Sequence, residues 1–210
     1  MKKYSTKRAC ESVSKRKTLL IDVDECICFG GFLDAVNEFL KTNYVIDDFT
    51  NYYIEEEAFQ DEDEKFIEFQ EYLMNRNLYE NAYVLPNAIE VIERLNKVYD
   101  VYILSSCINV FKKTSSGRLF KDKFDFLIKT LPFISPDKYI FTSSKHLFVA
   151  DSIIDDKLSN LENSSKEKIL FPSYHNKNVS DTDLSNKGVI RAGTDWRNGW
   201  NEVKKILLEK

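Results

Sequence analysis

Residues 19–29, LLIDVDECICF, are the stretch that decides the fold. Apolar residues lead directly into two acids one residue apart, Asp22 and Asp24, and a glycine pair follows at 30–31. This pattern predicts a buried parallel strand whose carboxyl end presents charge at a loop, although a solvated strand end would give the same letters. Ligands of open α/β sheets bind just past the carboxyl ends of the strands. Two carboxylates at that place are costly to bury alone, so they indicate a bound cation.

The composition is typical of a globular protein. The chain has 210 residues, of which 43% are hydrophobic and 30% are charged, enough for one domain or for a core domain with a small insertion. No stretch approaches the roughly 20 consecutive apolar residues of a membrane span, so we expect no membrane partner.

The first 17 residues differ from the rest of the chain in charge. They hold seven lysines and arginines and the single acid Glu11, and no apolar segment that could serve as a secretory signal follows them. We expect a disordered basic arm over residues 1–17, a solvated tail rather than a contact with nucleic acid or a membrane. The arm's charge of +6 is part of a net charge of −4, so the remainder carries −10 and should bind nucleic acid poorly.

The cysteines and histidines show no spacing that is typical of a structural metal site. No CxxC pair is present, and the histidines complete no familiar zinc pattern. Several of the cysteines stand at predicted strand ends as small apolar residues would, which fits the reducing cytosol and a cytoplasmic protein. The residues concerned are Cys10, Cys26, Cys28, Cys107, His146 and His175.

Residues 30–85 change character and predict an inserted helical subdomain. Many aromatic residues stand among a heavy load of acids, including EEE at 55–57 and DEDE at 61–64. Apolar residues recur at helical spacing, at Phe59, Phe66 and Phe69. We expect most of the aromatics to form the subdomain's core; one or two could instead face a substrate ring, a choice that the sequence leaves open.

From residue 86 onwards helices and strands alternate. Such alternation predicts an α/β fold with a doubly wound, mostly parallel sheet. Residues 18–29 and 86–210 would form this core, with 30–85 as a cap inserted after the first strand. The predicted helices cover residues 87–95, 117–130 and 195–208; the predicted strands after the first cover 99–104, 138–142, 147–156, 169–171 and 188–190.

Three of the predicted strands end in polar side chains of different kinds. Because parallel strands carry their carboxyl ends to one edge of the sheet, carboxylates, hydroxyls and an ammonium group can converge there. Singly, the serines could satisfy backbone groups, the acids could cap a helix and the lysine could lie on the surface; jointly, a functional site is the better interpretation. The residues are Asp22 and Asp24, Ser105 and Ser106, Lys145, and Asp151, Asp155 and Asp156.

This constellation resembles the haloacid dehalogenase-like phosphohydrolases, whose motifs are matched by DVDEC at 22–26, ILSS at 103–106, Lys145 and ADSIIDD at 150–156. Within that superfamily the chain is most similar to the 5'(3')-deoxyribonucleotidases. The similar segments are IFTSSK at 140–145, ADSIIDDK at 150–157, ILFPSYHNK at 169–177 and DWRNGWNEV at 195–203. The resemblance extends over residues 18–208, strongly after residue 85 and faintly in the insertion.

The resemblance implies roles for the acids at the strand ends. Asp22 would be the nucleophile that forms an aspartyl-phosphate, and Asp24 would give a proton to the leaving oxygen and later take one from water. Mg²⁺, a hard cation, would be held by Asp22, the backbone carbonyl of Asp24, and Asp156. Asp151 and Asp155 would lie close by as supporting groups.

It also implies roles for the hydroxyls and the lysine. Ser105 would donate a hydrogen bond to a phosphate oxygen, and Lys145 would offset the charge that the phosphoryl group and the carboxylates concentrate there. Ser106 is a weaker candidate for contact with the substrate.

The sequence departs from the family at a few positions. Relatives typically continue V-L-A-D after the D-x-D, whereas Phe29 stands here in place of the last acid. Ala150 replaces a frequent glycine, and Ser143-Ser144 replaces a more polar pair that often contains arginine. Phe29 lies where the leaving-group side of the pocket should begin, so the departure bears on the substrate more than on the phosphate chemistry.

The sequence therefore predicts a cytosolic, Mg²⁺-dependent phosphatase of small phosphate monoesters, with a deoxynucleoside monophosphate as the first candidate substrate. Two rivals remain: a phosphatase of a sugar or amino-acid phosphate, and a non-catalytic phosphate-binding regulatory protein of the same fold. The acidic insertion disfavours long polyanions in the cleft. A homodimer is compatible with the sequence, which does not decide it.

Overall fold

A computed structural model describes residues 16–60, 62–163 and 165–209. Most of the predicted basic arm, residues 1–15, therefore lies outside the described residues. No helix in the described ranges is both long and apolar enough to cross a bilayer.

Within the described residues, six strands form one sheet in which all neighbours run parallel. The order is β5-β4-β1-β6-β7-β8, which confirms the predicted α/β fold with a parallel sheet. The strands are β1 (Thr18–Ile21), β4 (Asp100–Ser105), β5 (Tyr139–Phe141), β6 (Ser152–Asp155), β7 (Glu167–Leu170) and β8 (Val189–Arg191). Because β1 lies between β4 and β6, its carboxyl end is flanked by the ends of both neighbours.

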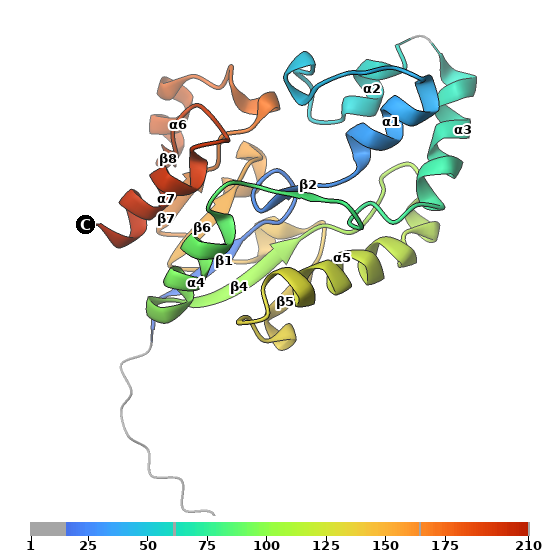
Figure 1. Ribbon diagram of the computed structural model, residues 1–210. Helices are drawn as coiled ribbons and strands as arrows, with labels where there is room; N and C mark the ends of the chain where they lie inside the picture. The colour runs from blue at the N-terminus through green and yellow to red at the C-terminus, as the bar shows by residue number, and fades with distance from the viewer. Residues whose placement is uncertain (1–15, 61, 164, 210) are drawn as a thin grey trace, which may run out of the picture.

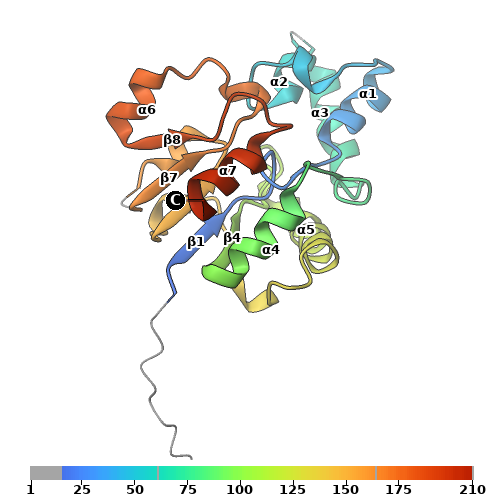
Figure 2. The same cartoon turned by 60° about the vertical axis from the view of Figure 1, so that its left-hand side comes forward.

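The side chains of β1 point alternately to the two faces of the sheet, so the hydrophobic core has two layers. Leu19 and Ile21 belong to the larger cluster, which the helices α4 (Ala88–Val98), α5 (Gly117–Thr130) and α7 (Gly199–Leu208) cover. Leu20 points to the smaller cluster on the other face, where α6 (Asp181–Lys187) packs. Figures 1 and 2 show α4, α5 and α7 together on one side of the sheet. A strand buried on both faces needs apolar side chains at successive positions, as the LLI run provides.

The insertion after β1 contains the predicted helices. A short antiparallel ribbon, β2 (Cys28–Phe29) with β3 (Tyr83–Val84), carries the chain out of the core and back. Between them lie α1 (Phe32–Leu40), α2 (Ile54–Ala58) and α3 (Asp63–Met74), which form a separate group at the upper right of Figure 1. We call residues 30–85 the cap; their status as a unit distinct from the core stays a prediction.

Aromatic side chains fill the interior of the cap. The Phe39 ring contacts those of Phe59, Phe69 and Tyr72, with centroids 5.4–5.8 Å apart. Phe69 is fully buried, and Phe59 is nearly so. Edge-to-face and tilted aromatic pairs of this kind add packing energy to the burial of apolar surface. These four aromatics are structural, as the helical spacing indicated. Six other cap aromatics line the cavity described below: Phe32, Tyr44, Tyr52, Tyr53, Tyr79 and Tyr83.

The prediction of one long strand over residues 147–156 is wrong. Strand β6 contains only Ser152–Asp155, and the preceding segment forms a short 3₁₀ turn, Lys145–Leu147, followed by a loop. Leu147 and Val149 are 72% and 59% exposed. Only four residues of β6 are paired with β7, so the apolar residues before them lie outside the sheet.

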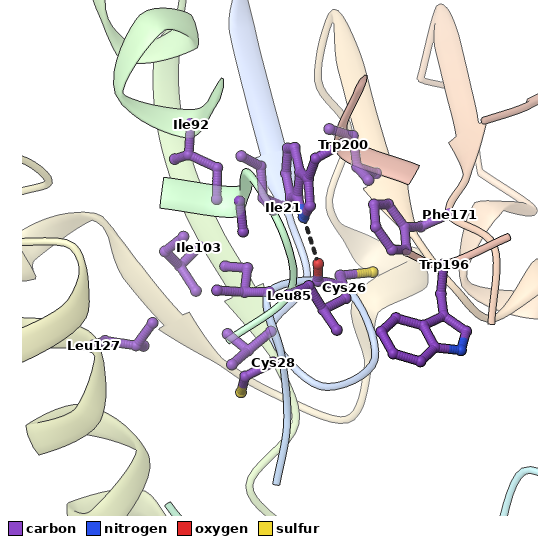
Figure 3. Packing of buried hydrophobic residues seen from close by; sticks show 14 of the residues in the cluster. Ile21, Cys26, Cys28, Leu85, Ile92, Ile103, Leu127, Phe171, Trp196 and Trp200 are labelled. Carbon is purple, nitrogen blue, oxygen red and sulfur yellow. Dashed lines mark hydrogen bonds between the residues drawn. The ribbon is translucent and has the colours of Figure 1, made fainter. Parts of the chain in front are cut away.

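Helix α7 is hydrogen-bonded to the loop that follows β1. Trp200 of α7 is fully buried, and its indole Nε1 donates a 2.7 Å hydrogen bond to the carbonyl of Cys26 (Figure 3). The Trp200 ring also packs on Phe171, with centroids 5.5 Å apart. A Cβ atom at Gly199 would lie 2.5 Å from the Phe171 ring, so only glycine fits at the start of this helix.

Candidate active site

The loop after β1 is a tight, internally bonded turn. Three backbone N–H groups, those of residues 26–28, donate to the carbonyl of Val23, and the N–H of Asp22 donates to the carbonyl of Ile154 in β6. Glu25 has a φ of 56°, a left-handed conformation that is uncommon outside glycine. This turn and the Trp200 bond hold Asp22 and Asp24 at a fixed place beyond the strand end.

Asp22 is buried and ion-paired. Its Oδ2 lies 2.6 Å from Lys145 Nζ, and its Oδ1 accepts a 2.7 Å hydrogen bond from the N–H of Val23. Burial raises the pKa of Asp22 to about 6, although Lys145 acts in the opposite direction. A cation beside this carboxyl therefore favours its charged, nucleophilic form.

Lys145 joins two of the predicted acids. Its Nζ also lies 2.8 Å from Asp155 Oδ2, and the lysine is only 5% exposed. Burial lowers the pKa of Lys145, but Asp155 and Asp22 raise it by more, so the ammonium form is favoured. Asp155 accepts two further hydrogen bonds, from the Lys157 N–H and the Asn160 amide, and is thereby fixed as an anchor for the lysine.

Asp156 also lies close to Asp22. Its Oδ2 is 2.6 Å from His175 Nε2, and its backbone carbonyl accepts a hydrogen bond from Asn176. Burial raises the pKa of the Asp156 carboxyl, with His175 opposing the shift. The side chain is 1% exposed, so a partner for its charge is needed.

The donor atoms near Asp156 fit a hard divalent cation. Ligand atoms of Asp22, Cys26 and Asp156 lie within 4.8 Å of one another. Burial, reinforced by Asp156 and Asp22, raises the pKa of the Cys26 thiol well above its ordinary value, so the sulfur is a neutral, soft donor. The two carboxylates are thus the ligands that suit Mg²⁺. The Asp24 carboxylate is not in this group, and the use of its backbone carbonyl stays a prediction.

Asp24 is bonded by two side chains that the sequence did not single out. Tyr79 donates a 2.6 Å hydrogen bond to Oδ1, and Lys123 Nζ lies 2.6 Å from Oδ2. Asp24 lines the main cavity, as do Asp22 and Lys145. Three of the predicted groups thus come together at one surface.

The two predicted serines differ in position. Ser105, the last residue of β4, is fully buried, and its hydroxyl accepts a hydrogen bond from Lys123. Ser106 lines the cavity and its hydroxyl lies 2.9 Å from that of Ser143. The structure therefore reverses the ranking: Ser106 is the hydroxyl at the cavity wall, and Ser105 supports the lysine.

The expected place of Asp151 beside the site is wrong. Asp151 precedes β6 and accepts hydrogen bonds from the N–H and hydroxyl of Thr18, the first residue of β1, and from Lys166. It therefore lies at the amino end of the sheet, opposite Asp22. Four strand residues separate Asp151 from Asp156, so the two acids lie at opposite ends of β6.

A cavity of about 520 Å³ opens onto Asp22 and Asp24. One part of its wall is aromatic: the Phe29 and Trp196 rings meet edge to face at 5.0 Å, and Tyr174 lies 6.5 Å from Phe29. The cap contributes Glu55, whose pKa burial raises to about 7. The cavity is therefore charged at its floor and largely apolar at its walls.

The cap contacts the core through two sets of polar side chains. In one set, Asp47 lies 2.8 Å from both Lys177 Nζ and Arg197 Nη2. In the other, the Asn109 amide donates to Gln70, and Arg118 donates to the carbonyl of Asn75. These contacts are polar, and most are exposed to solvent.

Comparison with known proteins identifies the family. The family described as 5' nucleotidase, deoxy (pyrimidine), cytosolic type C protein matches residues 16–204. The chain belongs to this 5' nucleotidase family. A relative from Staphylococcus epidermidis named "Putative 5'(3')-deoxyribonucleotidase" is 30% identical over 192 residues, 90% of this chain and 99% of the relative. The 5'(3')-deoxyribonucleotidase of Bacillus subtilis is 30% identical over 135 residues, 64% of this chain and 68% of that protein.

A solved structure supports the fold of this 5' nucleotidase. The haloacid dehalogenase-like hydrolase SP0104 from Streptococcus pneumoniae aligns with a TM-score of 0.53 at 15% identity, covering 93% of this chain and 99% of that one. The predicted resemblance to haloacid dehalogenase-like 5'(3')-deoxyribonucleotidases is thereby confirmed, as is the enzyme class, a phosphoric monoester hydrolase.

Sequence reasoning missed three residues of the candidate site. Lys123 stands four residues from both Leu119 and Leu127, which places it on the buried face of α5. A lysine on an apolar helix face was thus a signal in the sequence. Tyr79 was one of many aromatics in the cap, and His175 completed no zinc pattern, so neither gave a signal of its own.

Proposed function

We propose that the protein is a Mg²⁺-dependent phosphatase of deoxynucleoside monophosphates, acting through an aspartyl-phosphate on Asp22. The observation that carries the proposal is that Asp22 is paired with Lys145 and lies close to Asp156, at the floor of a cavity with aromatic walls. Family membership agrees with this assignment.

The reaction needs two displacements at phosphorus. In the first, an Asp22 oxygen forms a bond to phosphorus, the bond to the substrate oxygen breaks, and Asp24 gives a proton to that oxygen. In the second, Asp24 takes a proton from water, the water oxygen bonds to phosphorus, and the Asp22–phosphorus bond breaks to release phosphate. Lys145 offsets negative charge in both steps.

Asp22 and Asp156 would hold Mg²⁺ through carboxylate oxygens, and Asp24 through its backbone carbonyl. When bound, the ion would supply positive charge to the phosphoryl oxygens and to the carboxylates that surround them. His175 Nε2 lies 2.6 Å from Asp156 Oδ2. This contact fixes the orientation of the Asp156 carboxylate, including its other oxygen. Ser106, at the cavity wall, is the hydroxyl in reach of a phosphate oxygen.

The size and lining of the cavity support a nucleotide as the substrate. A volume of about 520 Å³ lies in the range of small-molecule sites. Phe29 stands where relatives carry an acid and contacts Trp196 and Tyr174, so this wall offers ring surface rather than charge. A flat base could stack on such a wall, since aromatic faces attract one another in offset and edge-to-face geometries.

The location that we propose for the enzyme is the cytoplasm. Cys26, Cys28 and Cys107 are free thiols and are buried, which suits a reducing compartment. The predicted homodimer stays a prediction.

The test is phosphate release from a panel of deoxynucleoside and ribonucleoside monophosphates, sugar phosphates and phosphoserine, each with Mg²⁺ and with EDTA. The proposal expects Mg²⁺-dependent release, fastest from deoxynucleotides. Release from sugar phosphates or phosphoserine alone would keep the chemistry and overturn the substrate. No release from any compound would favour a non-catalytic phosphate-binding role.

A further inference from the structure

The Asp24 carboxylate is held from two separate parts of the chain. Lys123 lies in α5 of the core, and Tyr79 lies in the segment between α3 and β3 that returns from the cap. Each lies 2.6 Å from a different carboxylate oxygen. A carboxylate offers about four lone-pair positions, so two positions are taken and two remain for a passing proton.

All the donors of Lys123 are used within the protein. Its Nζ lies 2.9 Å from Ser105 Oγ and 2.6 Å from Asp24 Oδ2, and it also donates to the backbone carbonyl of Ser106. An ammonium group has three N–H donors, so none is left for a phosphate oxygen. The side chain is 1% exposed and does not line the cavity. Lys123 is therefore placed to act through Asp24, not on the substrate.

Tyr79 is fixed just as firmly. Its residue is 6% exposed, its ring lies 5.6 Å from that of Phe126, and the Lys123 ammonium lies 5.4 Å from its centroid. The neighbouring carbonyl of Leu78 accepts a 2.6 Å hydrogen bond from the N–H of Gly31. The phenol thus belongs to the junction where the chain enters and leaves the cap.

We propose that Lys123 and Tyr79 are positioning residues that fix the orientation of the Asp24 carboxyl group for proton transfer to the leaving oxygen. The inference rests on the proposed function, in which Asp24 supplies that proton. Lys123 comes from the core, and Tyr79 comes from the base of the cap. The Asp24 carboxyl group therefore adopts the orientation for proton transfer only when the cap is packed on the core.

The consequence is a dependence on the leaving group. A nucleoside leaves as an alcohol and needs a proton as its bond to phosphorus breaks, whereas para-nitrophenolate leaves as a stable anion and does not. The value of kcat/KM reports the steps up to release of this group. Removing Lys123 or Tyr79 as a hydrogen-bond partner of Asp24 should therefore lower kcat/KM for the nucleotide and leave kcat/KM for para-nitrophenyl phosphate nearly unchanged.

The experiment compares kcat/KM for thymidine 5'-monophosphate and para-nitrophenyl phosphate in the wild type, Tyr79→Phe and Lys123→Met. We expect Tyr79→Phe to lose about 10-fold on the nucleotide and less than about 2-fold on the nitrophenyl ester, a fraction of what acid–base groups contribute. Lys123→Met should lose more, in the same pattern. If the Lys123 variant does not fold, Tyr79→Phe, which keeps the ring, decides alone.

Tyr72→Phe is the matched control. The Tyr72 hydroxyl also donates to a carboxylate, that of Glu38 at 2.7 Å, but it lies in the cap away from Asp24. The Tyr72→Phe change should leave kcat/KM for both substrates unchanged. Equal losses on both substrates in Tyr79→Phe would overturn the inference. A wild type that hydrolyses neither substrate would instead show that the proposed function has failed, and the inference with it.

Discussion

At the sheet edge, the buried carboxylates of Asp22, Asp155 and Asp156 each have a basic side chain within 3 Å, whereas the buried carboxyl of Glu55 in the cap has none among the described residues. Buried charge is tolerated when it is paired, and an unpaired carboxyl takes up a proton instead. At the sheet edge burial still raises the pKa of Asp22, Asp155 and Asp156, but a basic side chain opposes the shift at each of them, whereas no basic group in the described part of the chain opposes it at Glu55.

The largest effect should come from breaking the charged region at Asp22. Asp22→Asn removes the proposed nucleophile while keeping the shape of the side chain, so turnover should fall by roughly 10³-fold or more. Phosphate release measures the loss, and circular dichroism with a thermal melt checks that the fold is kept. Substantial residual Mg²⁺-dependent turnover would remove Asp22 as the nucleophile.

Glu55→Gln sharpens the contrast between paired and unpaired acids. Burial raises the folded pKa of Glu55 from 4.5 to about 7, so the folded state holds a proton that the unfolded state releases at lower pH. The free energy of unfolding of the wild type should therefore decrease as the pH rises from 4.5 to 7.

The variant has no such charge to bury. It should match the wild type near pH 4.5 and exceed it by about 2–3 kcal/mol at pH 8. Urea unfolding at the two pH values measures the difference. Glu56→Gln, the same change on an exposed neighbour, isolates the effect of burial. An advantage of Glu55→Gln that does not grow with pH would contradict the prediction.

Gly199→Ala tests how tightly the core behind the charged region is packed. The added Cβ would lie 2.5 Å from the Phe171 ring, and overpacking of this kind costs about 1–3 kcal/mol. Thermal denaturation should show the loss. Gly117→Ala is the control, since nothing lies within 4 Å of a Cβ there; it should leave the melting temperature equal or higher.

The smallest effect should come from loosening the cap. Asp47→Asn weakens the ion pairs with Lys177 and Arg197, which are partly exposed and together stabilise the contact between cap and core by about 1 kcal/mol or less. We expect KM to rise about 2–5-fold with kcat unchanged, and added salt to erase the difference between variant and wild type. Glu64→Gln removes a cap charge without an ion pair of this kind and should change neither constant.

Much of the charged region could be predicted because its pattern is local. A short apolar run that ends in acids or hydroxyls identifies a buried parallel strand and the edge where it ends, and Asp22, Asp24 and Asp156 stand at the ends of such runs. Lys145 was assigned through the resemblance to the family. The strand at 147–156 was predicted too long because a run of apolar residues does not show where backbone pairing with a neighbouring strand begins. Asp151 was misplaced for the same reason: it precedes the true strand.

The side chains that bind these acids could not be predicted from the residues next to them in the sequence. Lys123, Tyr79 and His175 come from other elements, and each reaches its carboxylate only through the tertiary fold. The lysine on the buried face of α5 was visible in the helical spacing, but its target was not. Cap geometry was least predictable, because repeated aromatics fit many packings equally well.

The hydrogen bond from Trp200 to Cys26 has a consequence for the growing chain. The turn that carries Asp22 and Asp24 is synthesised early, but the helix that donates this bond is the last element described. A nascent chain therefore lacks one tether of the turn that carries Asp22 and Asp24 until α7 has left the ribosome. The turn should reach its final conformation only after all six strands of the sheet have been synthesised.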